Sequence, residues 1–386
     1  MTAVLIACDK FKGSLTSAEV CAAVEAGIRR VRPDTAVAAM PMTDGGEGSV
    51  AAAFSAGFAE ITTTVTGPGG QPVAASFALR RSDGTAVVEM AQASGLLRLP
   101  GGLPDPLGAT SFGTGELVRA ALEVGARTII LAVGGSASTD GGAGFLQALG
   151  AILSRADGTP LRRGGKALGD LAVVDLNTLD SRLTGCRIIV AADVDNPLLG
   201  PRGAAAVYAP QKGADESHVR LLEEGLGHYV RTLRAAGLPA GAEDLPGAGA
   251  AGGLGFAAQS VLGATMRPGI DVMMDLAGFG EALATLTSAD LVITGEGSLD
   301  RQTLNGKAVA GVARAAWDAG VPAVAVCGRG LLERGELAGL GISQAYALTD
   351  HEPDVARCIS NAAALLESAA EQLAREWIRA EASLPG

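Results

Sequence analysis

Residues 128–149 read TIILAVGGSASTDGGAGFLQAL and join a short apolar run, a glycine-rich turn and the start of a helical pattern. The β-branched run at 128–133 has the length of a buried strand, and 145–149 opens a helix. Glycines let backbone N–H groups approach a ligand closely, and unpaired N–H groups at a helix N-terminus attract anions. The stretch therefore predicts a phosphate-binding turn, formed by Gly134, Gly135, Ser136, Ser138 and Thr139.

Asp140 lies in the middle of this turn. A carboxylate inside an anion-binding turn would repel phosphate, so Asp140 must either cap the helix or hold a cation or a hydroxyl group. An ordinary tight strand-to-helix connection is the alternative interpretation of the whole stretch. The functional interpretation is favoured because similar turns recur along the chain.

The first recurrence is DKFKGSLTSAE at 9–19, after an expected buried strand at Ala3–Cys8 and before a helix from about Ser17. Ligands of parallel sheets lie beyond the carboxyl ends of the strands. This position makes an anion-binding role for the loop as plausible as a pair of solvated lysines. The loop residues concerned are Asp9, Lys10, Lys12 and Ser14.

The second recurrence is TDGGEGS at 43–49, between a strand expected at 35–40 and a helix near 50–56. Asp44 and Glu47 give it an acidic character. Capping of the following helix by these two acids is the structural alternative.

A strand expected at 187–192 leads into DVDNPLLG at 193–200. Its oxygen-rich cluster of Asp193, Asp195 and Asn196 could hold a hard cation or accept a proton from a hydroxyl group. A structural Asx-turn is the alternative. Gln211 and Lys212 precede a long helix expected at 215–236.

Two further glycine-rich stretches lead to different predictions. GAGAAG at 247–252 fits a dinucleotide-binding pattern only formally, because no strand precedes it, and we expect a flexible or substrate-facing loop. GEGSLDRQTLNGK at 295–307 follows a strand expected at 289–294 and carries Glu296 and Asp300 beside glycines.

The order of patterns indicates two domains of α/β type. At 386 residues the chain exceeds one usual core. Short alternating runs at 61–90 suggest antiparallel strands of a second domain, and the strand at 289–294 suggests a return to the first. Helices expected at 307–319 and 354–380 and strands at 321–327 and 343–348 complete the first domain.

Composition excludes several classes of protein. The net charge of −11 disfavours nucleic acids and anionic membranes as partners. Five scattered cysteines without CxxC spacing favour reduced thiols in a cytoplasmic protein, and we find neither a leader pattern nor a membrane-spanning run.

The acidic glycine-rich loops predict two lobes that face each other across a cleft. Such loops with a few lysines suit phosphoryl transfer, in which Mg²⁺ neutralises phosphate charge. The chain lacks a GxxxxGK[ST] loop and the HRD and DFG motifs of protein kinases, so a different architecture is required.

Six motifs, in this order and spacing, resemble those of the bacterial type I glycerate kinases, and the resemblance covers essentially the whole chain. They are DKFKGSLTSAE, TDGGEGS, GGSASTDGGAGFLQALG, DVDNPLLGPRGAAAVYAPQKG, PGAGAAGGLG and TGEGSLDRQTLNGK. The resemblance implies ATP- and Mg²⁺-dependent phosphorylation of D-glycerate, typically at the 2-hydroxyl. It also implies a discontinuous flavodoxin-like domain with an inserted mixed α/β domain of restriction-enzyme-like topology. Two residues depart from the family pattern: Lys10 stands where Ser is usual, and Ser298 where Arg is common.

The resulting hypothesis is a glycerate 2-kinase with domains at 1–63 plus 286–386 and at 64–285, and with the active site in the cleft between them. Asp193 would be the base, with Lys12 as a second catalytic residue. Metal or hydroxyl contacts are assigned to Asp44, Glu47, Glu296 and Asp300. Substrate or phosphate contacts are assigned to Asp9, Lys10, Ser14, Asp195, Asn196, Gln211, Lys212 and the turn at 134–139. ATP and D-glycerate would be the partners, with a homodimer as an option.

Two alternatives remain at this stage. A non-catalytic two-lobe protein that senses a small hydroxy acid would need the cationic residues, but not so many carboxylates beside glycine loops. A kinase of another short hydroxy acid, such as tartronate or a sugar acid, is kept open by Ser298.

Overall fold

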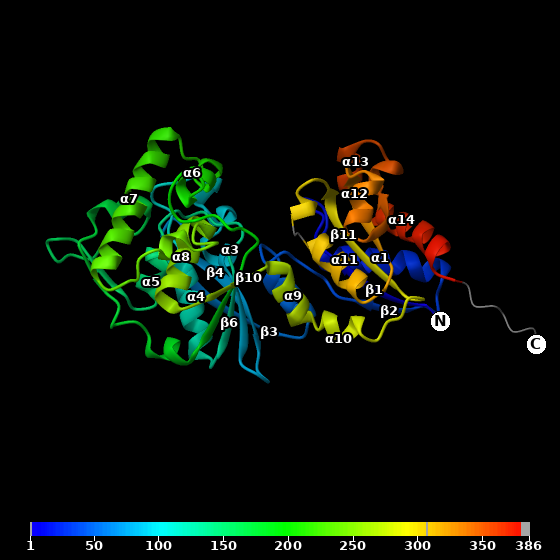
Figure 1. Cartoon of the computed structure of the whole chain (residues 1–386), viewed down its shortest axis with the longest axis horizontal. Coiled ribbons are helices and arrows are strands. Elements are labelled where there is room, and N and C mark those ends of the chain that lie inside the picture. Colours follow the sequence, from blue (N-terminus) through cyan, green and yellow to red (C-terminus); the bar gives the residue numbers. More distant parts are fainter. Residues whose placement is uncertain (1, 306–307, 380–386) are drawn as a thin grey trace, which may run out of the picture. The chain divides into compact units, whose positions relative to one another are not determined.

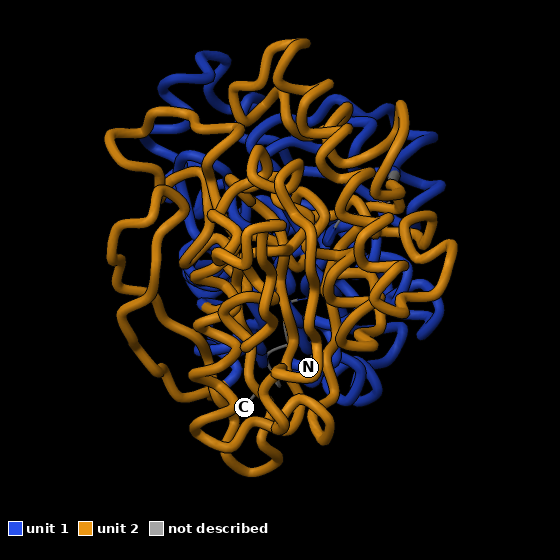
Figure 2. The backbone as a smooth tube through the Cα atoms, turned by 90° about the vertical axis from the view of Figure 1, so that its left-hand side faces the viewer, with its two compact units in different colours: residues 1–44, 51–56, 270–386 blue, residues 45–50, 57–269 orange. Residues whose placement is uncertain are grey.

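A computed structural model describes residues 2–305 and 308–379, and the chain divides into two compact units (Figure 2). Unit 1 comprises residues 1–44, 51–56 and 270–386, and unit 2 comprises 45–50 and 57–269. Unit 1 is thus discontinuous in sequence. The domain limits expected from the sequence, 63/64 and 285/286, stay a prediction.

Unit 1 contains a five-stranded sheet in the order β13-β12-β11-β1-β2, and every strand is parallel to its neighbours (Figure 1). Numbered within the unit, this order is 2-1-3-4-5 read from the β2 edge, which is the flavodoxin-like arrangement. The expected fold class of this part is therefore confirmed. The strands are β1 (Ala3–Cys8), β2 (Ala36–Ala39), β11 (Leu291–Leu299), β12 (Ala323–Gly330) and β13 (Ile342–Ala347).

Helices cover both faces of this sheet because its strands are apolar on both sides. Val4, Ile6 and Cys8 of β1 belong to the core beneath α1 and α14, whereas Leu5 and Ala7 face the core that includes α11. The helices are α1 (Ser17–Val31), α9 (Gly269–Ala277), α10 (Phe279–Leu283), α11 (Ala308–Asp318), α12 (Arg334–Gly339), α13 (Val355–Ser360) and α14 (Ala362–Trp377), and α2 (Ser49–Ser55) contains a boundary between the units. Short 3-10 turns lie at Thr303–Asn305 and Leu348–Asp350.

Unit 2 contains a mixed six-stranded sheet in the order β10-β9-β6-β5-β4-β3. The β3-β4 and β4-β5 pairs are antiparallel, and the remaining pairs are parallel. The mixed α/β class expected for the inserted part is thus confirmed. The strands are β3 (Ala59–Thr66), β4 (Pro72–Arg80), β5 (Thr85–Glu89), β6 (Thr128–Ala132), β9 (Arg187–Ala191) and β10 (Thr265–Arg267), with a separate pair of β7 (Ile152–Ser154) and β8 (Val173–Asp175).

The helices of unit 2 pack on this sheet and on one another around two apolar cores. They are α3 (Met90–Ser94), α4 (Phe112–Glu123), α5 (Ala143–Ala148), α6 (Ala204–Tyr208), α7 (Glu216–Ala235) and α8 (Ala250–Leu262). Short 3-10 helices are Leu96–Arg98, Pro100–Gly102, Gly165–Asp170, Ser181–Gly185, Pro210–Lys212 and Ala242–Asp244.

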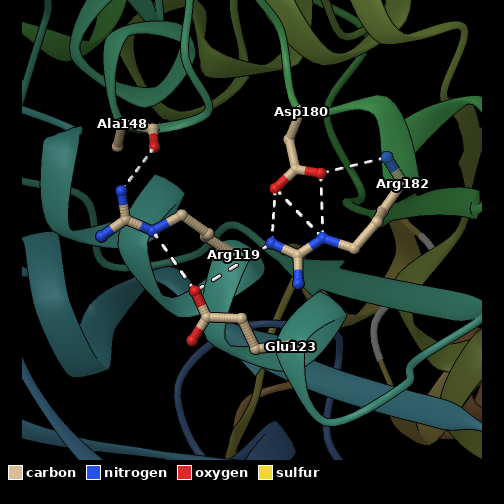
Figure 3. A network of polar contacts seen from close by, with 5 residues as sticks. All are labelled: Arg119, Glu123, Ala148, Asp180 and Arg182. Carbon is tan, nitrogen blue, oxygen red and sulfur yellow. Dashed lines mark hydrogen bonds and ion pairs between the residues drawn. The ribbon is translucent and has the colours of Figure 1, made fainter.

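A surface network of ion pairs joins α4 to the segment before β9 (Figure 3). Asp180 accepts from Arg182 at 2.6 Å, and Glu123 lies 4.0 Å from Arg182 and 3.8 Å from Arg119. Arg119 also donates to the carbonyl of Ala148 at 3.4 Å. These side chains are partly exposed, so each pair contributes little to stability.

Several expected boundaries need correction. Helix α1 is capped by Thr16 rather than by Ser17, because Thr16 and Glu19 form a reciprocal capping box. The last expected helix is two helices, with Asn361 between α13 and α14. Lys307 and Ala380, at the ends of two expected helices, lie outside the described residues.

Two glycine-rich stretches do not form the loops that we expected. Strand β11 continues through GEGSL, and its Gly295 and Gly297 pack against Val326 and Gly328, respectively, of the paired strand β12. The end of GAGAAG is the start of α8, which begins at Ala250, and Gly252 and the following Gly253 are buried in left-handed conformations. Among the described helices, none is long and apolar enough to cross a membrane.

Candidate active site

The first group of candidate residues lies where β1 and β11 are neighbours in unit 1. In this sheet order the connections leave β1 and β11 in opposite directions, which is where ligands bind in flavodoxin-like sheets. The N–H of Asp9 donates to the carbonyl of Gly295 at 2.8 Å. A Cβ atom at Gly297 would lie 3.2 Å from the nitrogen of Lys12. The loop after β1 therefore packs directly against the end of β11.

Three carboxylates come together at this point. The pKa of Asp9 is raised to about 7, chiefly by burial and then by the negative charges of Asp44 and Glu296, while Lys10 opposes the shift. The Glu296 side chain is buried and its Oε1 accepts from the hydroxyl of Thr303 at 2.6 Å. The structure thus brings Asp9, Asp44 and Glu296 into one electrostatic group, as the sequence indicated.

Other predicted residues of unit 1 have local roles in the structure. Asp300 organises its own turn, because its Oδ1 accepts from Gln302 N at 2.8 Å and its N–H donates to the hydroxyl of Thr303 at 3.1 Å. Ser14 donates to the carbonyl of Phe11 at 3.1 Å, and Lys12 is exposed.

Position 298, a departure from the family pattern, has a cationic neighbour. Ser298 is in register with Arg329 of β12, and Arg329 is exposed. The Ser298 hydroxyl is buried without a hydrogen-bond partner among the described residues. Sequence spacing gave no sign of this pairing, because 31 positions separate the two residues.

Mg²⁺ commonly uses one or two protein carboxylates together with substrate phosphates and water. In residues 2–305 and 308–379, no group of three or more His, Cys, Asp or Glu side chains is arranged to hold a metal ion by itself. The carboxylates of Asp9, Asp44 and Glu296 are of the oxygen type that Mg²⁺ takes as ligands.

The second group lies at the carboxyl ends of four parallel strands in unit 2. Glu89, Ala132, Ala191 and Arg267 form one row across β5, β6, β9 and β10. The turn beginning at Gly134 and the cluster at 193–196 follow two of these strands directly.

The TDGGEGS segment packs on this row through close glycine contacts. A Cβ atom at Gly134 would lie 2.6 Å from the Cα of Gly46, and one at Gly45 would lie 2.7 Å from the Cα of Gly269. Glycine is required at these positions because the backbones approach each other so closely. Glu47, assigned to the metal from sequence, belongs to this segment and is exposed.

Glu89 holds the same segment and was missed by sequence reasoning. It is buried at the end of β5, and its Oε2 accepts from the N–H groups of Gly48 and Val50 at 3.1 Å each. Glu89 therefore makes a capping contact with the backbone at the start of α2. An acid at the end of an apolar run carries no local sequence signal for this role.

The turn after β6 is tightly packed rather than open. Ser138, Thr139 and Asp140 are fully buried, and Ser136 is nearly so. Burial raises the pKa of Asp140, while hydrogen bonds lower it: Oδ2 accepts from the N–H of Ser111 at 2.8 Å and Oδ1 from that of Gly142 at 3.2 Å. Asp140 thus ties the turn to the start of α4, which agrees with a capping-type role.

Lys212 lies beneath this turn. Its side chain is 1% exposed, and its Nζ donates to the carbonyl of Ser138 at 2.5 Å. Burial lowers the pKa of Lys212 to about 7, and the negative charge of Asp140 opposes the shift. Lys212 is as buried as Ser138 and Thr139, so contact of any of these residues with a ligand would require a rearrangement. The neighbouring Gln211 is exposed.

The cluster after β9 divides into two kinds of residue. Asp193 is exposed and its Oδ1 accepts from the N–H of Gly269 at 2.8 Å. Asp195 pairs with Arg202 at 3.1 Å, and Asn196 accepts from the hydroxyl of Tyr208 at 2.5 Å. Asp195 and Asn196 therefore make local contacts near the loop, and their substrate role stays a prediction.

The structure thus assembles one group of predicted residues in each unit. Asp9, Lys10, Lys12, Ser14, Asp44, Glu296 and Asp300 belong to unit 1, and the remaining ones belong to unit 2. That both groups serve one active site stays a prediction.

Comparisons with known proteins cover nearly the whole chain. The model of the glycerate kinase family matches residues 4–378. A glycerate kinase from Bacillus subtilis (strain 168) is 41% identical over 372 residues, which are 96% of each chain. A glycerate 2-kinase from Escherichia coli (strain K12) is 44% identical over 326 residues, which are 84% of each chain.

A solved structure agrees with these sequence relatives. The crystal structure of a protein assigned as glycerate kinase 2 from Salmonella typhimurium LT2 superimposes with a TM-score of 0.85 at 40% identity, covering 97% of this chain and 98% of that one. With the family match over residues 4–378, these similarities show that the chain belongs to the glycerate kinase family.

Proposed function

We propose that the protein transfers the γ-phosphoryl group of ATP to the 2-hydroxyl of D-glycerate. The observation that carries this proposal is the match to the glycerate kinase family over residues 4–378, together with a relative described as glycerate 2-kinase. The carboxylate group of Asp9, Asp44 and Glu296 adds chemical support, since phosphoryl transfer needs carboxylates that hold a divalent cation.

We propose that Asp9, Asp44 and Glu296 hold Mg²⁺ together with the nucleotide phosphates. Mg²⁺ would neutralise charge on the transferred group. Asp300 and Glu47 are weaker candidates, since Asp300 binds its own turn and Glu47 is exposed. Lys10 and Lys12 are proposed to bind the anionic substrates, and the N–H groups of the turn at 134–139 to bind phosphate.

We propose Asp193 as the residue that orients or deprotonates the glycerate hydroxyl. Its carboxylate lies at the carboxyl end of β9 and is held by the N–H of Gly269, which leaves a fixed side chain at a strand end. Asp193→Asn keeps an oxygen for Gly269 but loses the base, so we expect kcat to fall by about 10²- to 10⁴-fold. Wild-type turnover in this variant, with ATP and glycerate still bound, would remove Asp193 from this role.

The reaction itself is tested with purified protein, ATP, Mg²⁺ and D-glycerate. We expect ADP to form only when glycerate is present, and phosphorus NMR to show 2-phosphoglycerate. A 3-phospho product would overturn the 2-hydroxyl as the acceptor. Failure to form ADP in the presence of D-glycerate would overturn D-glycerate as the substrate.

A second acceptor follows from a specific observation, the Ser298 and Arg329 pair. Arg329 offers a cation next to a position where the family commonly carries one. Tartronate and sugar acids are therefore tested in parallel, and a higher kcat/KM for one of them would change the proposed substrate. A cytoplasmic location and a homodimer remain predictions.

A further inference from the structure

We infer that Lys212 is a positioning residue: through the carbonyl of Ser138 it aims the backbone N–H group of Thr139, in the turn at 136–139, toward the phosphate of the nucleotide. The inference rests on the proposed phosphate role of this turn. It replaces the direct anion contact that the sequence suggested for Lys212.

The first argument is the place of the ammonium group. Nζ of Lys212 lies 2.5 Å from the Ser138 carbonyl oxygen, and the side chain is 1% exposed. Removing an ammonium group from water is costly, and one carbonyl with the nearby charge of Asp140 offsets only part of that cost. The lysine therefore has a role other than packing, because methionine would fill the same space without the cost of burying a charge.

The second argument is that the Ser138 carbonyl is fixed from two sides. A Cβ atom at Gly252 would clash with the Ser138 carbonyl oxygen. Gly252 follows Ala251, whose φ of 52° makes it the one non-glycine residue with a positive φ in the described chain. The strained backbone of α8 and the amine of Lys212 thus hold one peptide group between them.

The third argument concerns the donors that this arrangement leaves available. In a trans peptide the carbonyl of one residue and the N–H of the next point in opposite directions. Fixing the Ser138 carbonyl on Lys212 therefore fixes the N–H of Thr139 away from it. Among the described residues, the N–H groups of Ser136, Ser138 and Thr139 donate to no acceptor.

Unsatisfied hydroxyl groups in the same place are an independent sign of a missing partner. The Ser138 Oγ, Thr139 Oγ1 and Tyr229 hydroxyl are buried without hydrogen-bond partners within the described residues. Buried polar groups are nearly always satisfied, so a ligand or ordered water is expected beside this turn. Asp140 and Tyr229 border it from the turn and from α7.

The experiment compares Lys212→Met, which removes the donor, with Lys212→Gln, which keeps an uncharged donor, and uses the exposed Lys166→Met as a matched control. Hydrogen exchange of peptides covering 134–142 is measured in the free protein and with ADP, and the affinity is measured with a fluorescent ADP analogue. We expect Lys212→Met to speed free-state exchange at 134–142 and to weaken ADP binding about tenfold or more, with partial rescue in Lys212→Gln.

The outcomes are separable. Unchanged free-state exchange together with weaker ADP binding would mean a direct contact and would overturn the positioning role. Unchanged exchange and unchanged binding in both variants would overturn it as well. If ADP does not protect 134–142 from hydrogen exchange in the wild type, the proposed phosphate role of the turn fails. Exchange in the free protein still tests whether Lys212 holds the Ser138 carbonyl in place. The glycerate assay is independent of both measurements.

Discussion

Lys212 shows how a single buried charge couples stability to pH. Burial lowers the pKa of its ammonium group in the folded protein to about 7, while the unfolded chain has the ordinary value near 10.5. Between these values the unfolded state binds more protons than the folded state. Stability contributed by this residue must therefore rise as pH increases through that window.

We expect the free energy of unfolding of the wild type to rise relative to Lys212→Met by about 2–3 kcal/mol between pH 7 and pH 9, since each unit of the window contributes at most about 1.4 kcal/mol. Urea unfolding at several pH values measures the difference. The exposed Lys166→Met corrects for the loss of a surface charge. A difference that stays flat or falls with pH would contradict the lowered pKa.

At the scale of single residues, the sequence could identify which residues lie at strand ends but not how deeply their side chains are buried. Asp9 and Asp193 were recognised because they directly follow apolar runs, and parallel strands bring such positions to one edge. The burial of Lys212 and the role of Glu89 depend on packing against segments remote in sequence. A lysine before a helix and an acid after a strand look like ordinary surface residues.

At the scale of elements, strands were easier to predict than glycine-rich connections. The β-branched run at 128–133 matches β6 closely, because such side chains suit a buried, pleated surface. The strand expected at 289–294 continues through GEGSL as β11, and Val326 of the neighbouring strand leaves no room for a side chain at Gly295. Local propensity alone cannot distinguish a glycine that forms a turn from a glycine that leaves room for a closely packed neighbouring strand.

Helix α8 offers a test of this interpretation, because its first turn contains left-handed residues. Ala251 has φ 52° and ψ 42°, a conformation that costs an L-residue about 1–2 kcal/mol. Ala251→Gly removes this strain, although glycine also loses more entropy on folding. We therefore expect a gain of about 0.5–1 kcal/mol in the free energy of unfolding, measured by urea denaturation.

The matched control is Ala18→Gly on the exposed face of α1, where the backbone is helical. There the same exchange should cost about 0.5–1 kcal/mol. Equal losses at both positions would show that Ala251 is not strained.

At the scale of the whole molecule, the sequence indicated the fold class because the pattern of apolar residues changes twice along the chain. Alternating runs at 61–90 form the antiparallel strands β3 and β4, and the buried run after 289 returns as β11 beside β1. The segment 45–50 could not be assigned in this way, since it belongs to unit 2 through backbone contacts of glycines that carry no hydrophobic pattern.

Each unit has a core of its own, so a core deletion should act first on the unit that holds it. Leu366 of α14 and Leu226 of α7 are both fully buried, the former in a core of unit 1 and the latter in a core of unit 2. Truncation of either leucine to alanine should cost about 2–5 kcal/mol. We expect Leu366→Ala to lower hydrogen-exchange protection of β1 and β11 with little change in β6, and Leu226→Ala to lower protection of α7 and α8 with little change in β1. The two substitutions serve as each other's control because they remove the same side chain from fully buried positions. Equal losses in both units from either variant would instead mean that the chain unfolds as one cooperative body.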